Sequence, residues 1–128
     1  MEREMNWFKI EKIEIAHEDE RRSISAIFNG DFTAKQVKIL HIKQDSILGN
    51  HYHNYRELFY VLSGESIYLL ENIETKEREY VILSEGYRLI IQPNVAHRAE
   101  MTKGTVMLEA TEEPYISASQ NDVKYEVK

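Results

Sequence analysis

The stretch Gly49-Asn50-His51-Tyr52-His53-Asn54-Tyr55-Arg56-Glu57 predicts both the fold and the site of this chain. Side chains alternate between the two faces of a β-strand, so His51 and His53 are expected to point to the same face. Glu57 has the same parity and joins them if the segment in between bends without changing face. The stretch therefore predicts two imidazoles and one carboxylate that face one another.

A fourth candidate, His97, lies far downstream in Pro93-Asn94-Val95-Ala96-His97. Three imidazoles and one carboxylate supply nitrogen donors and one hard anionic oxygen, a ligand set that suits a borderline divalent metal. A histidine on a strand is often only a surface or packing residue, and that is the alternative interpretation. However, the chain has only five histidines, and three of them fall at these offsets. We predict a site for manganese, iron, nickel or zinc, with the ligands His51, His53, Glu57 and His97.

This spacing resembles the first motif of the cupin family. His51-Tyr52-His53, three further residues, Glu57, six residues and Gly64 fit the second half of that motif. Asp45 stands where the motif begins with glycine, and Gly49 is a shifted substitute.

The second cupin motif is matched in its outer spacing, from Gly86 to His97. Inside it, Pro93 comes one residue late, Asn94 replaces a glycine and Met101 replaces the final asparagine. Asparagine tolerates the left-handed conformation that a glycine would supply. The resemblance covers about residues 36 to 111. It implies a small jelly-roll barrel, with the metal residues of the family at the four positions named above; some cupins keep the fold and leave the site empty.

The periodicity of the chain agrees with that fold. About ten short runs of alternating or β-branched residues are separated by turn signals, and no amphipathic helix is evident, so we predict an all-β sandwich or barrel. Residues 36–43 are largely apolar on both faces, so this strand is expected to be covered on two sides. Residues 57–63 are apolar on both faces apart from Glu57, which gives their sheet something to bury in a dimer. We expect a single domain over residues 1–128: N-terminal strands in 1–35, the barrel core in about 36–111 and a tail in 112–128 that docks or frays.

Composition narrows the function classes. A net charge of −6 argues against a nucleic-acid-binding protein, which normally has a basic face. The absence of cysteine excludes disulfides, thiolate ligands and a cysteine nucleophile. We see neither a signal peptide nor an apolar run long enough for a membrane span, so we expect a cytoplasmic protein without membrane contact.

The ligand set leaves an open metal position for water or substrate. Such a position polarises a carbonyl, orients a substrate or, with iron, binds oxygen. Acid–base partners can come from the nearby aromatic and imidazole side chains, namely Tyr52, Tyr55, Tyr60, Tyr68, Tyr87 and His41. Because Tyr52 has the opposite parity to the histidines, we select Tyr55 and Tyr87. Arg56 and Arg98 are candidates for holding an anionic substrate.

A closer resemblance is to small cupins of bacterial polysaccharide biosynthesis, which include sugar-nucleotide ketoisomerases. It rests on residues 19–24, on the run Gly49-Asn50-His51-Tyr52-His53 and on the spacing from Glu57 to Gly64. It implies a small-molecule ligand such as a sugar or sugar nucleotide. It also implies that His51 or His53 can serve as the acid–base group that moves a proton alpha to a keto group, without a metal. Leu48 stands where such proteins usually carry arginine, which argues against binding of a nucleotide diphosphate.

Three functions follow from these observations. The first is an isomerase or epimerase that acts on a sugar or related carbonyl compound. The second is an iron-dependent dioxygenase. The third is a non-enzymatic cupin that binds a ligand or metal. In each case we expect a homodimer, since most soluble oligomers are two-fold.

Overall fold

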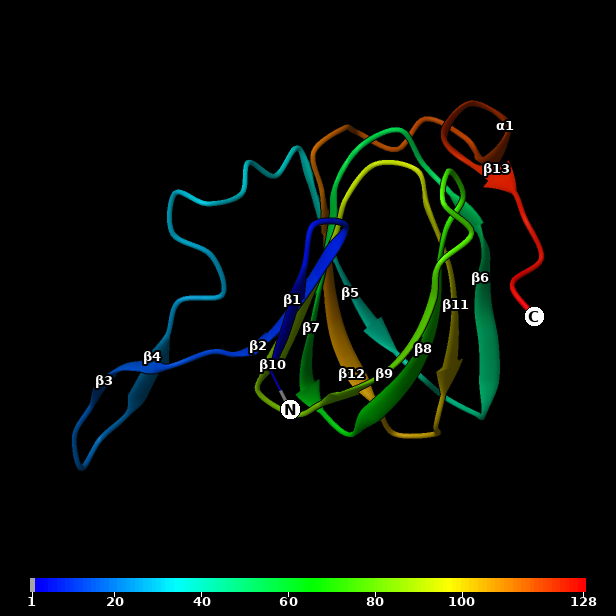
Figure 1. The fold of residues 1–128 in the computed structure, drawn as a ribbon. Helices are drawn as coiled ribbons and strands as arrows, with labels where there is room; N and C mark the ends of the chain where they lie inside the picture. Colours follow the sequence, from blue (N-terminus) through cyan, green and yellow to red (C-terminus); the bar gives the residue numbers. More distant parts are fainter. Residues whose placement is uncertain (1) are drawn as a thin grey trace.

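The computed structural model describes residues 2–128, in which two antiparallel β-sheets face each other and form a barrel (Figure 1). The six-stranded sheet has the order β1 (Arg3–Met5), β2 (Phe8–Lys12), β10 (Tyr87–Ile91), β7 (Glu57–Ser63), β12 (Val106–Thr111) and β5 (Gln36–His41). The five-stranded sheet has the order β13 (Val123–Lys124), β6 (Ser46–Tyr52), β11 (Val95–Met101), β8 (Glu65–Asn72) and β9 (Arg78–Ser84). The all-β prediction is confirmed.

The core lies between the inner faces of the two sheets. Strand alternation on β7 sends Phe59 and Val61 inward, where both are buried. Tyr68 of β8 is also buried there, and its hydroxyl lies 3.3 Å from Met107 Sδ. Because these side chains fill one part of the barrel, the space for a ligand is confined to the remainder.

A second, smaller cluster covers part of the outer face of the six-stranded sheet. Leu58 and Ile90 point outward and are buried by Phe28 and Phe32, which belong to the segment before β5. The outer face of β7 is therefore covered at Leu58 by the chain itself, while Leu62 stays exposed.

The expectation that residues 36–43 are covered on both sides is wrong for β5 in the single chain. Val37 and Ile39 are 54% and 47% exposed. They alternate with Lys38 and Leu40, which line the interior, and so lie on the outer face of β5, which residues 2–128 leave largely uncovered. Burial of these two side chains requires a cover other than the part of the chain that the structure describes.

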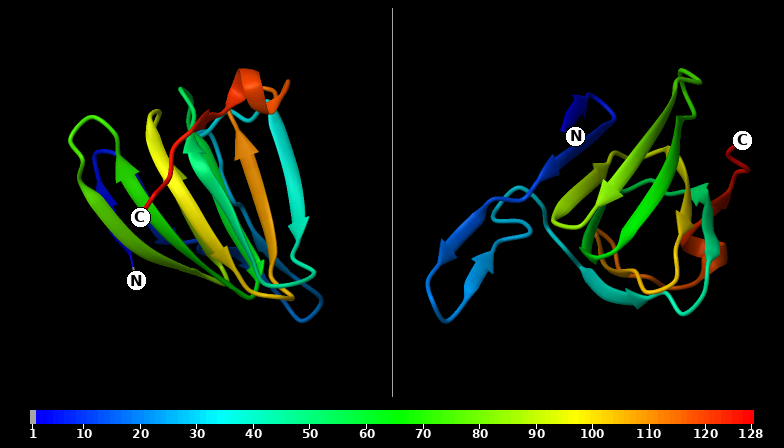
Figure 2. Two further views of the ribbon diagram at one scale, coloured as in Figure 1. Left: turned by 90° about the vertical axis from the view of Figure 1, so that its right-hand side faces the viewer. Right: turned by 90° about the horizontal axis from the view of Figure 1, so that it is seen from below.

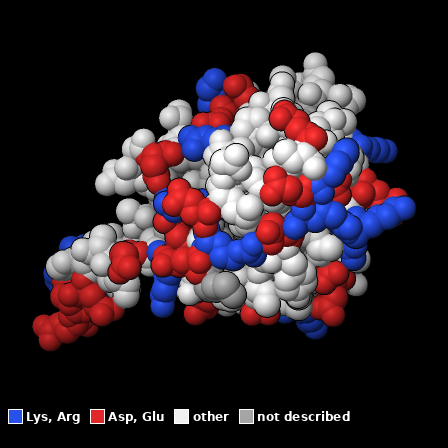
Figure 3. All heavy atoms as spheres, viewed as in Figure 1, with Lys and Arg blue, Asp and Glu red and all other residues white. Residues whose placement is uncertain are grey.

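Part of the N-terminal region lies outside the barrel (Figure 2). The strands expected within residues 1–35 are present but short, and the last of them is β4 (Ser23–Ser25). β4 pairs with β3 (Ile15–Glu18) in a hairpin that projects from the barrel (Figure 2). Acidic side chains gather at the tip of this hairpin, where the sequence reads Glu18-Asp19-Glu20 (Figure 3).

The C-terminal tail docks. A helical turn, α1 (Ala118–Asn121), leads into β13, which pairs with the end of β6, and Val127 is buried. Within residues 2–128, no helix is long and apolar enough to cross a membrane.

Candidate functional site

A β-bulge places two of the predicted histidines opposite each other. His97 on β11 pairs with His51 on β6, but the next residue, Arg98, pairs with Gly49, so Asn50 is the extra residue. Gly49 and Asn50 have φ values of 95° and 58°, in the left-handed region. The imidazoles of His51 and His97 therefore meet edge to face, with ring centroids 4.7 Å apart.

Glu57 completes the cluster from the opposite sheet. It begins β7, and its buried Oε1 lies 2.9 Å from His53 Nε2 and 3.5 Å from His97 Nε2. The ring of His53 lies 4.7 Å from that of His51. The structure thus brings together all four residues that the sequence predicted as ligands.

Backbone carbonyls fix the orientation of the two buried imidazoles. Nδ1 of His53 lies 2.7 Å from the carbonyl oxygen of Asn121, and Nδ1 of His97 lies 3.4 Å from that of Val95. A carbonyl oxygen only accepts hydrogen bonds, so each Nδ1 carries the proton. In both rings the other nitrogen, Nε2, faces Glu57.

The environment separates the proton affinities of His51 and His53. Burial, together with nearby His97, lowers the pKa of His51 to about 4. Burial also acts to lower the pKa of His53, but the contact with Glu57 outweighs it and raises that pKa above 6.5. For Glu57, burial acts to raise the pKa, and the adjacent His97 and His53 lower it overall. His51 is therefore neutral at neutral pH, whereas His53 is the imidazole that holds a proton more tightly.

The three histidines could also hold a divalent metal ion, with Glu57 beside two of them. One nitrogen from each of His51, His53 and His97 lies within 4.8 Å of the others. Two ligands about 2.1 Å from one ion stand about 3 Å apart in cis, similar to the distances from Glu57 Oε1 to His53 and His97. Within residues 2–128, Oε1 of Glu57 is buried and receives no aligned hydrogen bond. Histidine ligands commonly donate their other N–H to a carbonyl, as His53 and His97 do here.

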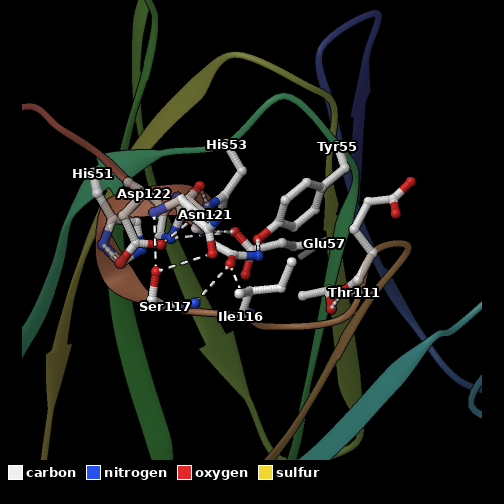
Figure 4. A network of polar contacts seen from close by, with 12 residues as sticks. His51, His53, Tyr55, Glu57, Thr111, Ile116, Ser117, Asn121 and Asp122 are labelled. Carbon is white, nitrogen blue, oxygen red and sulfur yellow. Dashed lines mark hydrogen bonds and ion pairs between the residues drawn. The ribbon is translucent and has the colours of Figure 1, made fainter.

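The C-terminal tail contributes residues that the sequence did not single out. Asp122 Oδ1 lies 3.3 Å from His53 Nδ1, and its Oδ2 lies 3.6 Å from His51 Nδ1. Tyr55, a predicted site residue, stacks on His53 with ring centroids 4.7 Å apart and an interplanar angle of 14°. Its hydroxyl accepts a hydrogen bond from Asn121 Nδ2 (Figure 4). No local motif marks Asn121 or Asp122, because only the docking of the tail brings them to the histidines.

A cavity of about 310 Å³ adjoins this cluster. Part of its lining comes from the six-stranded sheet, where Lys38 of β5 lies 3.3 Å from Glu109 of β12. Burial raises the pKa of Glu109, although Lys38 acts in the opposite direction. The cavity therefore has a polar wall besides the histidines.

Tyr87 is not brought to this cavity. It begins β10, which runs antiparallel to β7 and pairs its last residue, Ile91, with Glu57. At about 3.3 Å per residue, Tyr87 is more than about 12 Å from Glu57 along the sheet. Its selection as a site residue is corrected, because strand parity could not show at which end of the barrel the tyrosine lies.

The two candidate arginines are engaged elsewhere. Arg56 contacts the carboxylate of Glu112 through Nε and Nη2. Arg98 contacts Glu100. Neither arginine lines the cavity.

Comparison with known proteins supports the fold. No protein-family model and no curated protein matches the chain by sequence. Solved structures do match. The TDP-quinovose 3,4-ketoisomerase of Campylobacter jejuni superposes with a TM-score of 0.81 and 21% identity, over 94% of each chain. The chain has the cupin fold.

Two further cupin structures are similar. A sugar 3,4-ketoisomerase of Thermoanaerobacterium thermosaccharolyticum, solved with TDP, has a TM-score of 0.77 and 20% identity, over 94% of this chain and 90% of that one. The dTDP-6-deoxy-D-glucose-3,5-epimerase of Legionella pneumophila, solved with dTDP-4-keto-L-rhamnose, has a TM-score of 0.78 and 18% identity, over 95% and 74%. The resemblance of the sequence to cupins is thereby confirmed at the level of the fold.

Proposed function

We propose that this cupin is an isomerase or epimerase that moves a proton beside the carbonyl group of a keto sugar. The observation that carries the proposal is a pair of adjacent histidines beside a cavity of about 310 Å³. The pKa of His51 is lowered and the pKa of His53 is raised. Titratable neighbours whose pKa values are pushed apart are suited to the roles of base and acid. Keto-sugar isomerases and epimerases of the same fold support the reaction class.

The reaction needs a base, an acid and an enediol intermediate. Neutral His51 takes the proton from the carbon beside the carbonyl, and the electrons of that C–H bond form the enediol as the carbonyl oxygen gains a proton from an acid. Return of a proton to the former carbonyl carbon, with loss of the hydroxyl proton at the first carbon, moves the carbonyl. Return of a proton to the first carbon from the other face, with loss of the proton that the carbonyl oxygen had gained, inverts the first carbon. His53, whose charge Glu57 stabilises, is the candidate acid.

A metal offers the alternative chemistry at this cluster. A divalent ion held by His51, His53, Glu57 and His97 would polarise the carbonyl oxygen of a substrate. The two chemistries exclude each other at His51, because a nitrogen bound to a metal has no lone pair for a proton. Metal content and the effect of chelation on turnover therefore separate them.

The polar wall limits the substrate class. Among the described residues that line the cavity, Lys38 is the only lysine or arginine, and it already contacts Glu109. Glu57, Glu109 and Asp122 supply three carboxylates. This lining favours the neutral hydroxyl groups of a sugar, so a nucleotide diphosphate, if the substrate carries one, lies outside the cavity.

The experiment that tests the proposal is a turnover assay followed by NMR. A histidine-to-asparagine variant of the Thermoanaerobacterium ketoisomerase was solved with TDP-4-keto-6-deoxyglucose, which makes that compound a suitable probe. We expect a shifted carbonyl or an inverted centre in this compound or in a nucleotide-free keto sugar, and a loss of turnover in His51→Asn. Oxygen uptake with bound iron would favour the dioxygenase, and binding without turnover would favour a binding cupin. The homodimer and the cytoplasmic location remain predictions.

A further inference from the structure

The side chain of Asn121 connects the C-terminal tail to the histidine cluster. Its Oδ1 accepts hydrogen bonds from the backbone N–H groups of Ile116 and Ser117, at 2.8 and 3.1 Å. Its Nδ2 donates to the hydroxyl of Tyr55 at 3.0 Å and to the carbonyl of Pro114 at 3.1 Å. The amide thereby makes four hydrogen bonds, two as acceptor and two as donor.

This network leaves one orientation of the amide. Two backbone N–H groups point at one end of the side chain, and the carbonyl of Pro114 lies at the other. A flipped amide would set its NH₂ group against two donors and its oxygen against an acceptor. The position of Asn121 is thus defined by the fold of the tail itself.

The backbone of the same residue holds His53. The carbonyl oxygen of Asn121 accepts the proton of His53 Nδ1 at 2.7 Å, and Tyr55, which Asn121 binds through Nδ2, stacks on the imidazole. Figure 4 shows Asn121 between these two residues and the turn at Ser117. His53 is therefore held at Nδ1 by the main chain of Asn121 and on one ring face by a tyrosine that its side chain positions.

We propose that Asn121 is a positioning residue that keeps the proton of His53 on Nδ1 and directs Nε2 toward Glu57. Acid–base transfer and metal ligation both need Nε2 of His53 in this direction, so the inference does not depend on which chemistry the site performs. It also makes the tail, including α1, an integral part of the site.

NMR of the side-chain nitrogens in the resting, EDTA-treated protein tests this inference. In the wild type we expect His53 to carry a proton on Nδ1 that is protected from exchange with water. In Asn121→Ala the four side-chain hydrogen bonds are lost and the carbonyl is held by the backbone hydrogen bonds of the turn alone, so we expect that protected proton signal to disappear. Gln120→Ala changes an exposed neighbour on the same turn and should leave the His53 signals unchanged.

A protected Nδ1 proton that persists in a folded Asn121→Ala variant would overturn the inference. If that variant does not fold, Asn121→Asp takes its place, because aspartate keeps the two acceptor bonds to Ile116 and Ser117 and loses both donated bonds, to Tyr55 and to Pro114. We then expect a shifted His53 resonance and faster exchange, whereas an unchanged His53 would again overturn the inference. These measurements need no substrate, so their failure is distinguishable from failure of the proposed isomerase reaction.

Discussion

His97 lies directly opposite His51 in the β11–β6 ladder, and the register slips by one residue immediately after this pair. The slip is the bulge at Gly49 and Asn50. It brings the strands so close at this point that a Cβ atom on Gly49 would stand 2.6 Å from the carbonyl oxygen of His97. The geometry of the two histidines therefore depends on a glycine two residues before His51.

Gly49→Ala should be markedly destabilising. Any alanine with a positive φ costs about 1–2 kcal/mol, and here overlap with the His97 backbone adds about 1–3 kcal/mol. Gly30→Ala is the matched control, because Gly30 has a φ of 88° and no atom within 4 Å of its Cβ position. Urea unfolding of both variants measures the difference, and equal losses of stability would contradict the role assigned to the bulge.

The four-residue cluster could be predicted from the sequence because its members have local signatures. Strand parity relates His51 to His53, and motif spacing relates them to Glu57 and His97. The bulge was not predictable, since pairing register depends on which strands meet. Parity nevertheless placed His51 and His53 correctly relative to each other, because the extra residue, Asn50, precedes both.

The rest of the site depends on long-range docking that leaves no periodic signal. Asn121 and Asp122 lie in a polar tail that was expected to dock or fray, and only the pairing of β13 with β6 brings them to the histidines. Tyr87 was misplaced for the same reason: alternation gives the face of a strand but not its end. Val37 is exposed because the described residues leave the outer face of β5 uncovered, and an apolar pattern does not show what covers a face.

Metal binding should depend on Glu57. After EDTA treatment and incubation with zinc, we expect about one ion per chain in the wild type and loss of the ion in Glu57→Ala, because the hard anionic ligand is removed. Glu100→Ala is the control on an outward-facing, half-exposed carboxylate. Elemental analysis measures the content, and equal zinc in wild type and Glu57→Ala would contradict the ligand set.

The metal-free protein should become less stable as the pH is lowered, because of His51. Its pKa is about 4 in the folded chain and near 6.5 when exposed, so the unfolded state binds more protons between these values. The stabilisation from neutral His51 is present above pH 6.5 and is lost as the pH falls toward 4. Thermal melts of wild type and His51→Asn over this range isolate the effect. A difference between the two that does not vary with pH would refute the lowered pKa.

Glu109 should contribute to substrate binding through the polar wall of the cavity. Hydrogen bonds to a charged group contribute about 1.5–3 kcal/mol, so Glu109→Gln should raise KM for a keto sugar roughly tenfold or more. We expect a smaller effect on kcat than on KM, because Glu109 lies on the wall opposite the histidine-bearing strands. Steady-state kinetics beside Glu100→Gln provide the measurement. An unchanged KM would show that this wall does not contact the sugar.

Proton transfer at His51 is tested most directly by hydrogen exchange of the substrate. Wild-type protein and His51→Asn are incubated in D₂O with TDP-4-keto-6-deoxyglucose and with nucleotide-free keto sugars, and deuterium at the carbons beside the carbonyl is followed by NMR. The account predicts incorporation with the wild type and a rate lower by about 10²-fold or more in the variant, which is the contribution of a general base. Incorporation at the same rate in both proteins, or no incorporation into any compound that the wild type binds, would contradict it.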